Sequence, residues 1–170
     1  IVTYTGNGSA AQSIGHGLSS GAPELIFVKN RDAADSWAVY HHSLGNAAHM
    51  ILDTGAGQTT SSAYWGSFTP TTSLFKVGSD HKLNASGEKY VAYLWHGVEG
   101  YSKFGFYDAN QNADGPFIYT GFRPRMIFIK MTVTGDGWGV WDSERGPSNV
   151  IDNIVQWNLT GAESRSSYYN

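Results

Sequence analysis

The feature that most constrains the fold is an internal match between two stretches of the chain. The run Pro23–Lys29 matches Pro124–Lys130 without a gap, and Trp37–Tyr40 matches Trp138–Trp141 in the same register. Short apolar runs often resemble each other by chance, but a proline, a lysine and a tryptophan shared at one constant offset are poorly explained that way. The sequence therefore predicts a tandem repeat of a unit of roughly 100 residues, the size of one small domain.

Weaker matches extend the repeat upstream. Tyr4–Asn7 lies over Tyr107–Asn110, and Gly17–Leu18 lies over Gly121–Phe122 once the stretch Ser19–Gly21 is treated as a loop insertion. The flanks of the central match thus recur as well, and we interpret the repeat as a whole domain copied once.

The second copy is expected to be incomplete. The first, residues 1–100, closes with two strand-like runs, Leu74–Gly78 and Glu88–Trp95, and the second, residues 101–170, stops before any counterpart of them. Unless a partner chain supplies those strands, the second copy leaves an open sheet edge, which invites pairing with another chain. Because the chain starts at Ile1 without an initiator methionine or a signal sequence, the simpler expectation is an excerpt of a longer array or a processed product.

Alternating apolar residues and turn signals predict strands through most of the chain. We expect them at Ile1–Thr5, Gln12–Gly15, Glu24–Lys29, Trp37–His41, His49–Asp53, Ser73–Val77, Tyr90–His96, Lys103–Tyr107, Phe117–Thr120, Arg125–Thr132, Gly137–Asp142 and Ile154–Leu159. Single helical turns are expected at Ser43–Ala48 and Pro147–Asn153. Only 15% of residues are charged and 21 are glycines, which favours strands joined by tight turns. The predicted class is all-β, an antiparallel β-sandwich.

Composition argues against several classes of partner and site. The formal net charge is −3, which gives no basic surface for nucleic acid. The chain has no cysteine, so disulfides, thiolate zinc sites and cysteine nucleophiles are impossible. The longest apolar runs, such as Leu25–Val28, are far shorter than the roughly 18 residues of a membrane span. We therefore expect neither nucleic acid nor a membrane span.

Residue types that carry chemistry are present but do not form a recognisable constellation. His41 and His42 are adjacent on an expected strand and point to opposite faces, with His49 nearby, so we expect no metal site. The carboxylates that could serve a glycosidase are Asp32, Asp35, Asp53, Asp142 and Glu144, and most lie in or beside turns, where aspartate closes the backbone. No serine elbow or phosphate-binding glycine loop occurs. The prediction is a protein without catalytic residues or a cofactor.

Aromatic residues are the remaining candidates for a contact site. Trp37 and Trp138 recur at matching strand positions, which indicates core packing. Tyr64 and Trp65 differ because they follow a segment rich in glycine, threonine and serine, where a loop aromatic stacks on a sugar or a neighbouring subunit. We take Tyr64 and Trp65 as candidate glycan or partner contacts, with a local packing anchor as the alternative.

Several longer strings resemble a domain family repeated in tail-fibre-like and other structural virion proteins of marine bacteriophages. They are Ile1–Ala10, Gly15–Leu18, Val28–Asp32, Trp37–His41, Asn84–Gly87, Val98–Gly105 and Ala113–Pro124. The resemblance implies a lectin-type sandwich of the concanavalin-A-like or jelly-roll kind, with no family site residues to carry over. One departure is Tyr107–Gln111, where the family often has Tyr-Thr-Gly-Asn-Gly, so we expect a different turn there.

Three functions follow from these observations. The first is a virion structural protein, in a tail fibre, an appendage or a head decoration, that adheres to a host-surface glycan. The second is a polysaccharide-degrading enzyme on a lectin-like fold, and the third is an architectural module that binds only other virion subunits. The first is preferred, with localisation in the virion and with other virion proteins or copies of the chain, as a homo-oligomer, as partners.

Overall fold

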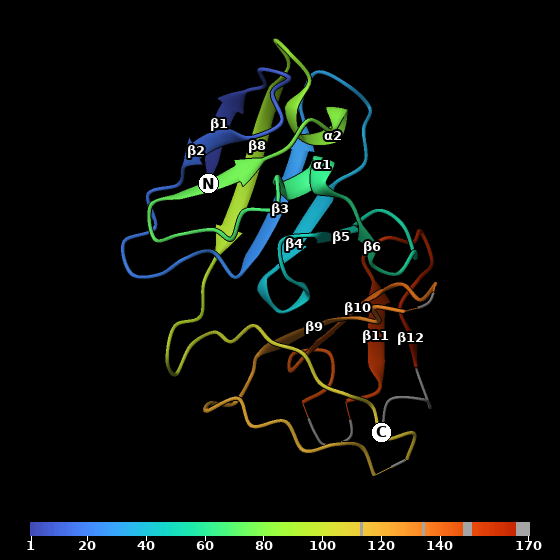
Figure 1. Ribbon diagram of the computed structural model, residues 1–170. Helices are drawn as coiled ribbons and strands as arrows, with labels where there is room; N and C mark the ends of the chain where they lie inside the picture. The colour runs from blue at the N-terminus through green and yellow to red at the C-terminus, as the bar shows by residue number, and fades with distance from the viewer. Residues whose placement is uncertain (113, 134, 148–150, 166–170) are drawn as a thin grey trace. The chain divides into compact units, whose positions relative to one another are not determined.

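The computed structural model describes residues 1–112, 114–133, 135–147 and 151–165 (Figure 1). Antiparallel strands dominate it, and its helices are single turns, so the predicted all-β class is confirmed. No helix in these ranges is long and apolar enough to cross a membrane. The chain divides into two compact units, one of residues 1–52 with 58–97 and one of residues 53–57 with 98–170. Each unit is described by itself below.

The first unit contains a six-stranded antiparallel sheet. Its strands in spatial order are β1 (Val2–Thr5), β8 (Lys89–Trp95), β3 (Leu25–Asn30), β4 (Ala38–His41), β5 (Ala48–Ile51) and β6 (Thr59–Thr60). Strand β8 comes last in the sequence of this unit, and it pairs with the first strand, β1, on one side and with β3 on the other. Ile26 and Val28 of β3 are fully buried, which fits a central strand.

A second, two-stranded sheet shares the core of the first. It consists of β2 (Gln12–Gly15) and β7 (Leu74–Val77), and Phe75 and Val77 pack in one apolar cluster with Tyr90 and Ala92 of β8. The short helices α1 (Ser62–Trp65) and α2 (His81–Asn84) and the 3₁₀ turn η1 (His42–Leu44) complete the unit. Burial of the apolar residues that the two sheets contribute to this cluster is the main source of stability in such a unit.

The second unit has one four-stranded antiparallel sheet. Its order is β12 (Ser164–Arg165), β11 (Asn153–Gln156), β10 (Trp138–Asp142) and β9 (Met126–Lys130). Large apolar residues buried in its described part are Trp138, Trp141 and Ile154. Phe128 stacks on Trp138 with ring centroids 5.2 Å apart. The core is therefore small and mostly aromatic.

Strands β9 to β12 follow one another across their sheet as β3 to β6 do across theirs. The Lys29 ammonium donates to the carbonyl of Asp35 at 2.6 Å, and the Lys130 ammonium donates to the carbonyl of Asp136 at 2.7 Å. Each lysine lies in the strand that precedes a hairpin and ties down the connecting loop. The local match seen in the sequence thus shares this one lysine contact in both units.

The structure does not show the predicted tandem repeat of a roughly 100-residue unit, because the sheets of the two units differ in strand number and order. The strands predicted at Lys103–Tyr107 and Phe117–Thr120 are wrong, since neither segment belongs to a sheet. Their matches in the first unit overlap β1 and β2, which pair with β8 and β7. An extended segment becomes a strand only when its backbone groups find a partner, and the described residues hold no counterpart of β7 or β8.

The remaining differences are local. The turn expected at Ser43–Ala48 is η1, which lies slightly earlier. The helical turn expected at Pro147–Asn153 falls partly on residues 148–150, outside the described residues. Gln111 has a φ of 55°, the left-handed value that Gly8 has in the first unit with 71°, so this position of the turn keeps its geometry despite the loss of glycine.

Candidate functional site

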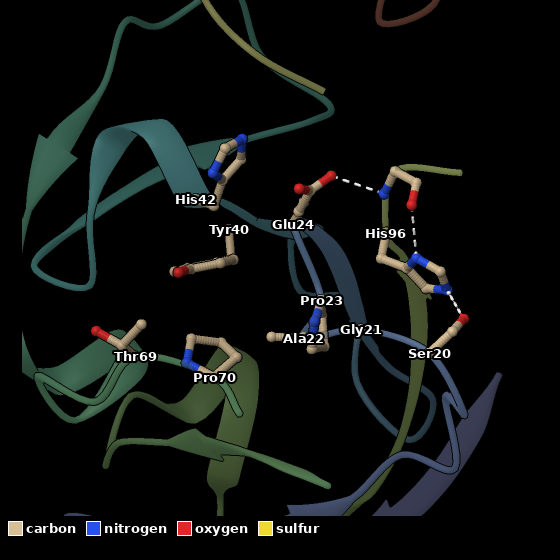
Figure 2. A pocket seen from close by; sticks show the side chains of 11 residues that line it. Ser20, Gly21, Ala22, Pro23, Glu24, Tyr40, His42, Thr69, Pro70 and His96 are labelled. Carbon is tan, nitrogen blue, oxygen red and sulfur yellow. Dashed lines mark hydrogen bonds between the residues drawn. The ribbon is translucent and has the colours of Figure 1, made fainter. Parts of the chain in front are cut away.

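Loops from four parts of the first unit border an open depression of about 430 Å³. Figure 2 places His42 and Glu24 along one side, Thr69 and Pro70 along the opposite side, and Tyr40 between them. Lining residues are Ser20, Gly21, Ala22, Pro23, Glu24, Tyr40, His42, Thr69, Pro70, His96 and Gly97. They combine a carboxylate, imidazoles and hydroxyls with the apolar surface of two prolines and a tyrosine.

Backbone hydrogen bonds set the position of Glu24. Its N–H donates to the carbonyl of Trp95 at 2.8 Å, and its carbonyl accepts from the N–H of His42 at 2.8 Å. The three segments that meet here thus continue the ladder of β8, β3 and β4. The Glu24 Oε2 accepts a hydrogen bond from the N–H of Gly97 at 2.7 Å, which fixes the carboxylate at the rim of the depression.

The tautomer of His96 follows from its contacts (Figure 2). Its Nδ1 lies 2.8 Å from the carbonyl oxygen of Gly97, which only accepts, so Nδ1 carries the proton. Its Nε2 lies 3.0 Å from the Ser20 hydroxyl and, in the neutral ring, accepts from it. A Cβ on Gly21 would lie 3.1 Å from the His96 ring, so the absence of a side chain there lets the loop pass close. The imidazole is thereby held in one orientation.

Tyr40 supplies the floor of the depression. It lies on β4 and is buried, and its ring meets Trp65 edge to face at 5.5 Å. Burial raises the pKa of the Tyr40 hydroxyl, so the side chain stays neutral at physiological pH. A neutral aromatic floor beside polar groups is the arrangement with which proteins bind the apolar face and the hydroxyls of one small ligand.

Tyr64 and Trp65, the candidate contacts from the sequence, lie in α1 and are 6% and 1% exposed. Tyr64 stacks on His49 with ring centroids 3.4 Å apart, and burial raises its pKa to about 12. Trp65 lies behind the floor of the depression, against Tyr40. These surroundings are those of a packing anchor, and we assign neither residue to the depression.

The histidines outside the depression make separate local contacts. His41 Nδ1 accepts from the N–H of Ser43, and burial with the neighbouring His42 lowers the His41 pKa to about 4. His49 Nε2 lies 2.9 Å from the hydroxyl of Thr59. Among the described residues no group of three or more histidine, aspartate or glutamate side chains could hold a metal ion.

The candidate carboxylates close loops or form ion pairs. Asp32 Oδ2 accepts from the N–H of Lys89, and Asp142 Oδ1 accepts from the N–H groups of Glu144 and Arg145. Glu144 also pairs with Arg125 at 2.6 Å on the surface. These contacts fit the structural role that turn aspartates usually have.

Asp35 has a carboxylate neighbour that the sequence did not suggest. Its Oδ2 and the Oε2 of Glu88 both accept from the Asn30 side-chain amide, and Asn30 is buried. Asp53 lies in the short segment 53–57 that belongs to the other unit. The candidates do not converge on one site.

Sequence reasoning missed the residues of the depression. Ser20 and Gly21 belong to the stretch that interrupts the internal match, and insertions in loops are frequent places for binding residues. His96 directly follows the last strand of the sheet. That insertion was the one available signal, because nothing in the sequence brings Thr69 and His96 together.

A family model described as Domain of unknown function (DUF7483) matches residues 1–170. No curated protein matches the chain. No solved structure matches it either.

Proposed function

The chain belongs over residues 1–170 to this family of domains of unknown function, and from that premise we propose that it is a structural protein of a bacteriophage virion whose first unit adheres to a host-surface glycan. The virion assignment is supported by the long strings that resemble domains of phage structural proteins. The glycan assignment is supported by the depression beside Tyr40. Two facing sheets with one core support a concanavalin-A-like sandwich for the first unit.

The observation that carries the proposal is the mixture of groups in the depression. Glu24 is an acceptor fixed by Gly97, and His42 and Thr69 add groups able to donate or accept. Sugar hydroxyls need such partners, while the C–H groups of a pyranose pack on apolar lining such as that of Ala22, above the buried Tyr40 and Pro70. The open shape suits a terminal or branch residue of a surface glycan.

A polysaccharide esterase, which differs from the polysaccharide-degrading enzyme expected from the sequence, is a second candidate because of the pair Ser20 and His96. A serine hydroxyl 3.0 Å from an imidazole whose other nitrogen is held by a carbonyl is the minimal arrangement of a nucleophile and its base. This pair would cleave an ester substituent of a polysaccharide rather than a glycosidic bond, which uses two carboxylates. The purely architectural module is the third alternative, in which the depression holds no glycan.

A glycan array followed by calorimetry on the best hit tests the proposal. Glu24→Gln keeps an oxygen for the N–H of Gly97 and removes the charge, and we expect it to weaken binding by roughly tenfold, as for the loss of one charged hydrogen bond. Glu144→Gln removes an exposed carboxylate of the second unit and is the matched control, with unchanged affinity.

Three outcomes contradict adhesion at this place. If Glu24→Gln and His42→Ala both bind the glycan hit as tightly as the unchanged protein does, the glycan does not bind in this depression. Ester release that disappears in Ser20→Ala would favour the enzyme. An array without hits, together with specific capture of a virion subunit, would favour the architectural module.

A further inference from the structure

The depression of the first unit has a carboxylate whose charge no neighbouring side chain neutralises. Glu24 is the one carboxylate of the lining, and the lining residues include no lysine or arginine. Glu24 forms no ion pair within the described part of the chain. Its Oε2 accepts from the N–H of Gly97 at 2.7 Å, and no described residue donates to its Oε1. One carboxylate oxygen is therefore available to a donor on a ligand.

The two imidazoles of the lining do not form an ion pair with this carboxylate. His96 donates from Nδ1 to the carbonyl of Gly97 at 2.8 Å, and its Nε2 lies 3.0 Å from the Ser20 hydroxyl. His42 lies on the same side of the depression as Glu24 but forms no ion pair with it (Figure 2). A fixed carboxylate without a paired cation attracts a positively charged ligand group and repels a negatively charged one.

The floor of the depression has a second polar atom without a partner. Tyr40 is 2% exposed, and its hydroxyl forms no hydrogen bond with any described residue. The Tyr40 oxygen is not one of the fully enclosed, unpaired polar atoms of the described residues, which belong to His49, Thr54 and Trp65. It therefore opens into the depression, and Figure 2 shows it turned toward Thr69 and away from Glu24. Because this hydroxyl is poorly solvated, a ligand group that pairs with it loses little to competition from water.

We propose that the depression is selective for a sugar with a protonated amino group, which donates to Glu24 Oε1 while a hydroxyl of the same sugar pairs with the Tyr40 hydroxyl. This inference rests on the glycan adhesion proposed above and narrows its ligand to amino sugars that are not acetylated. An ammonium group has donors only, and its hydrogen bond to a carboxylate is stronger than one from a neutral hydroxyl. Acetylation removes this charge, and the carboxylate of an acidic sugar meets the like charge of Glu24.

Methyl glycosides of glucosamine and galactosamine are the direct probes. They are compared with the methyl glycosides of their N-acetylated forms, of glucose and of glucuronic acid. Each is titrated into the full chain and followed by saturation-transfer NMR, in a mildly acidic buffer that keeps the sugar amine protonated. We expect an amino glycoside to bind roughly tenfold more tightly than its N-acetylated form. The glucuronide should bind most weakly of the set.

Variants of the charged groups locate the amine. Glu24→Gln keeps an oxygen for the N–H of Gly97 and removes the charge, so an amino glycoside and its N-acetylated form should then bind about equally. His42→Gln removes the ionisable ring on the same side of the depression and keeps polar atoms there. It should leave the ratio of the two affinities unchanged. Glu144→Gln, in the second unit, should change neither affinity.

The hydroxyl of the floor is tested by Tyr40→Phe, which removes one oxygen and no hydrogen bond among the described residues. We expect every glycoside to bind roughly fivefold more weakly, as for the loss of one neutral hydrogen bond, and the melting temperature to stay the same or rise. Tyr90→Phe is the matched control, because the Tyr90 hydroxyl donates to the carbonyl of His81 at 2.6 Å inside the fold. It should lower the melting temperature and leave the affinities unchanged.

Three results would overturn the selectivity and leave glycan adhesion in place. In the first, the unchanged protein binds the amino and N-acetylated glycosides equally well. In the second, the preference for the amine persists in Glu24→Gln. In the third, Tyr40→Phe lowers the melting temperature and binds every glycoside as before, which would identify a structural hydroxyl. If no glycoside binds and a glycan array gives no hit, adhesion itself is wrong, and the selectivity fails with it.

Discussion

The two units contain the same succession of four strands but bury their apolar residues very differently. In the first unit the exposed large apolar side chains are Ile1 and Trp95. In the second they extend over both extended segments, the sheet edge and the loops that follow it. Both units have the lysine-tied hairpin, so local sequence forms that element in each. What differs is the layer that covers it, and burial is therefore decided by distant partner strands.

The largest difference should appear between a buried tryptophan of the first unit and a largely exposed tryptophan of the second. Trp65 is fully buried, so Trp65→Ala should lower the free energy of unfolding of the first unit by about 3–5 kcal/mol. Trp157 contacts Phe128 edge to face but is 57% exposed, and Trp157→Ala should cost less than about 1 kcal/mol. Hydrogen exchange of peptides from each unit, measured across a urea series, reads the two separately.

Equal losses in the free energy of unfolding for Trp65→Ala and Trp157→Ala would contradict this difference between the units. A large effect of Trp157→Ala would mean that this tryptophan contributes to packing as much as the buried Trp65 does. Trp65→Phe is the control for size, because it keeps most of the apolar contact and also removes an indole N–H that is buried without a hydrogen-bond partner.

The sequence predicts which residues are able to form strands better than it predicts which of those strands find a partner. Period-2 patterns gave β2 with the same bounds as the structure and placed β3, β4 and β10 within a residue at either end. The same patterns failed at 103–107 and 117–120, where the residues favour a strand but the partner strand is not among the described residues. Alternation indicates which residues are able to pair, and it carries no information about whether a partner is available.

The candidate site shows a related limit. Tyr64 and Trp65 lie in a polar stretch, which suggested exposure, yet a single turn capped by Ser61 directs both into the core. The depression is built from loops distant in sequence, with Glu24, Thr69 and His96 brought together by the sheet. Convergence of that kind depends on register and sheet order, which no local pattern specifies.

A second, smaller difference concerns glycines at close contacts. A Cβ on Gly78 would collide with the carbonyl of Ala63, and the Gly78 N–H donates to Tyr64 at 2.6 Å. Gly78→Ala should therefore lower the stability of the first unit by about 1–3 kcal/mol, since backbone must move. Gly161 of the second unit has nothing within 4 Å of the added Cβ, and Gly161→Ala should change stability by less than about 0.5 kcal/mol.

Thermal unfolding of the two alanine variants, with the same exchange readout, checks this pair. Equal losses would show that Gly161 lies in packing as close as that around Gly78. A stabilised Gly78→Ala would show that the strand β7 and helix α1 separate easily at this point, contrary to the tight core described for the first unit.

The smallest expected effect is a difference in acid sensitivity at one matching position. His41 and Asp142 both end a strand and accept from the N–H two residues later, at Ser43 and Glu144. The His41 pKa is lowered from 6.5 to about 4 by burial and by His42, so the unfolded chain binds the proton first as pH falls. The stability that His41 contributes is present above pH 6.5 and is lost as pH falls toward 4.

Asp142 behaves differently because Arg145 lowers its pKa below 3.8, and its contribution persists until the pH falls below that value. Between pH 6.5 and 4 the first unit should therefore lose stability at this position while the second does not. His41→Gln removes the titration and should flatten part of the slope, the rest coming from His49, whose pKa is also lowered by burial. The loss of stability in acid is measured from the hydrogen-exchange rates of each unit at pH 7 and pH 4.5, corrected for the pH dependence of the intrinsic exchange rate. Equal acid loss in the two units, or a slope unchanged in His41→Gln, would mean that this histidine does not distinguish them.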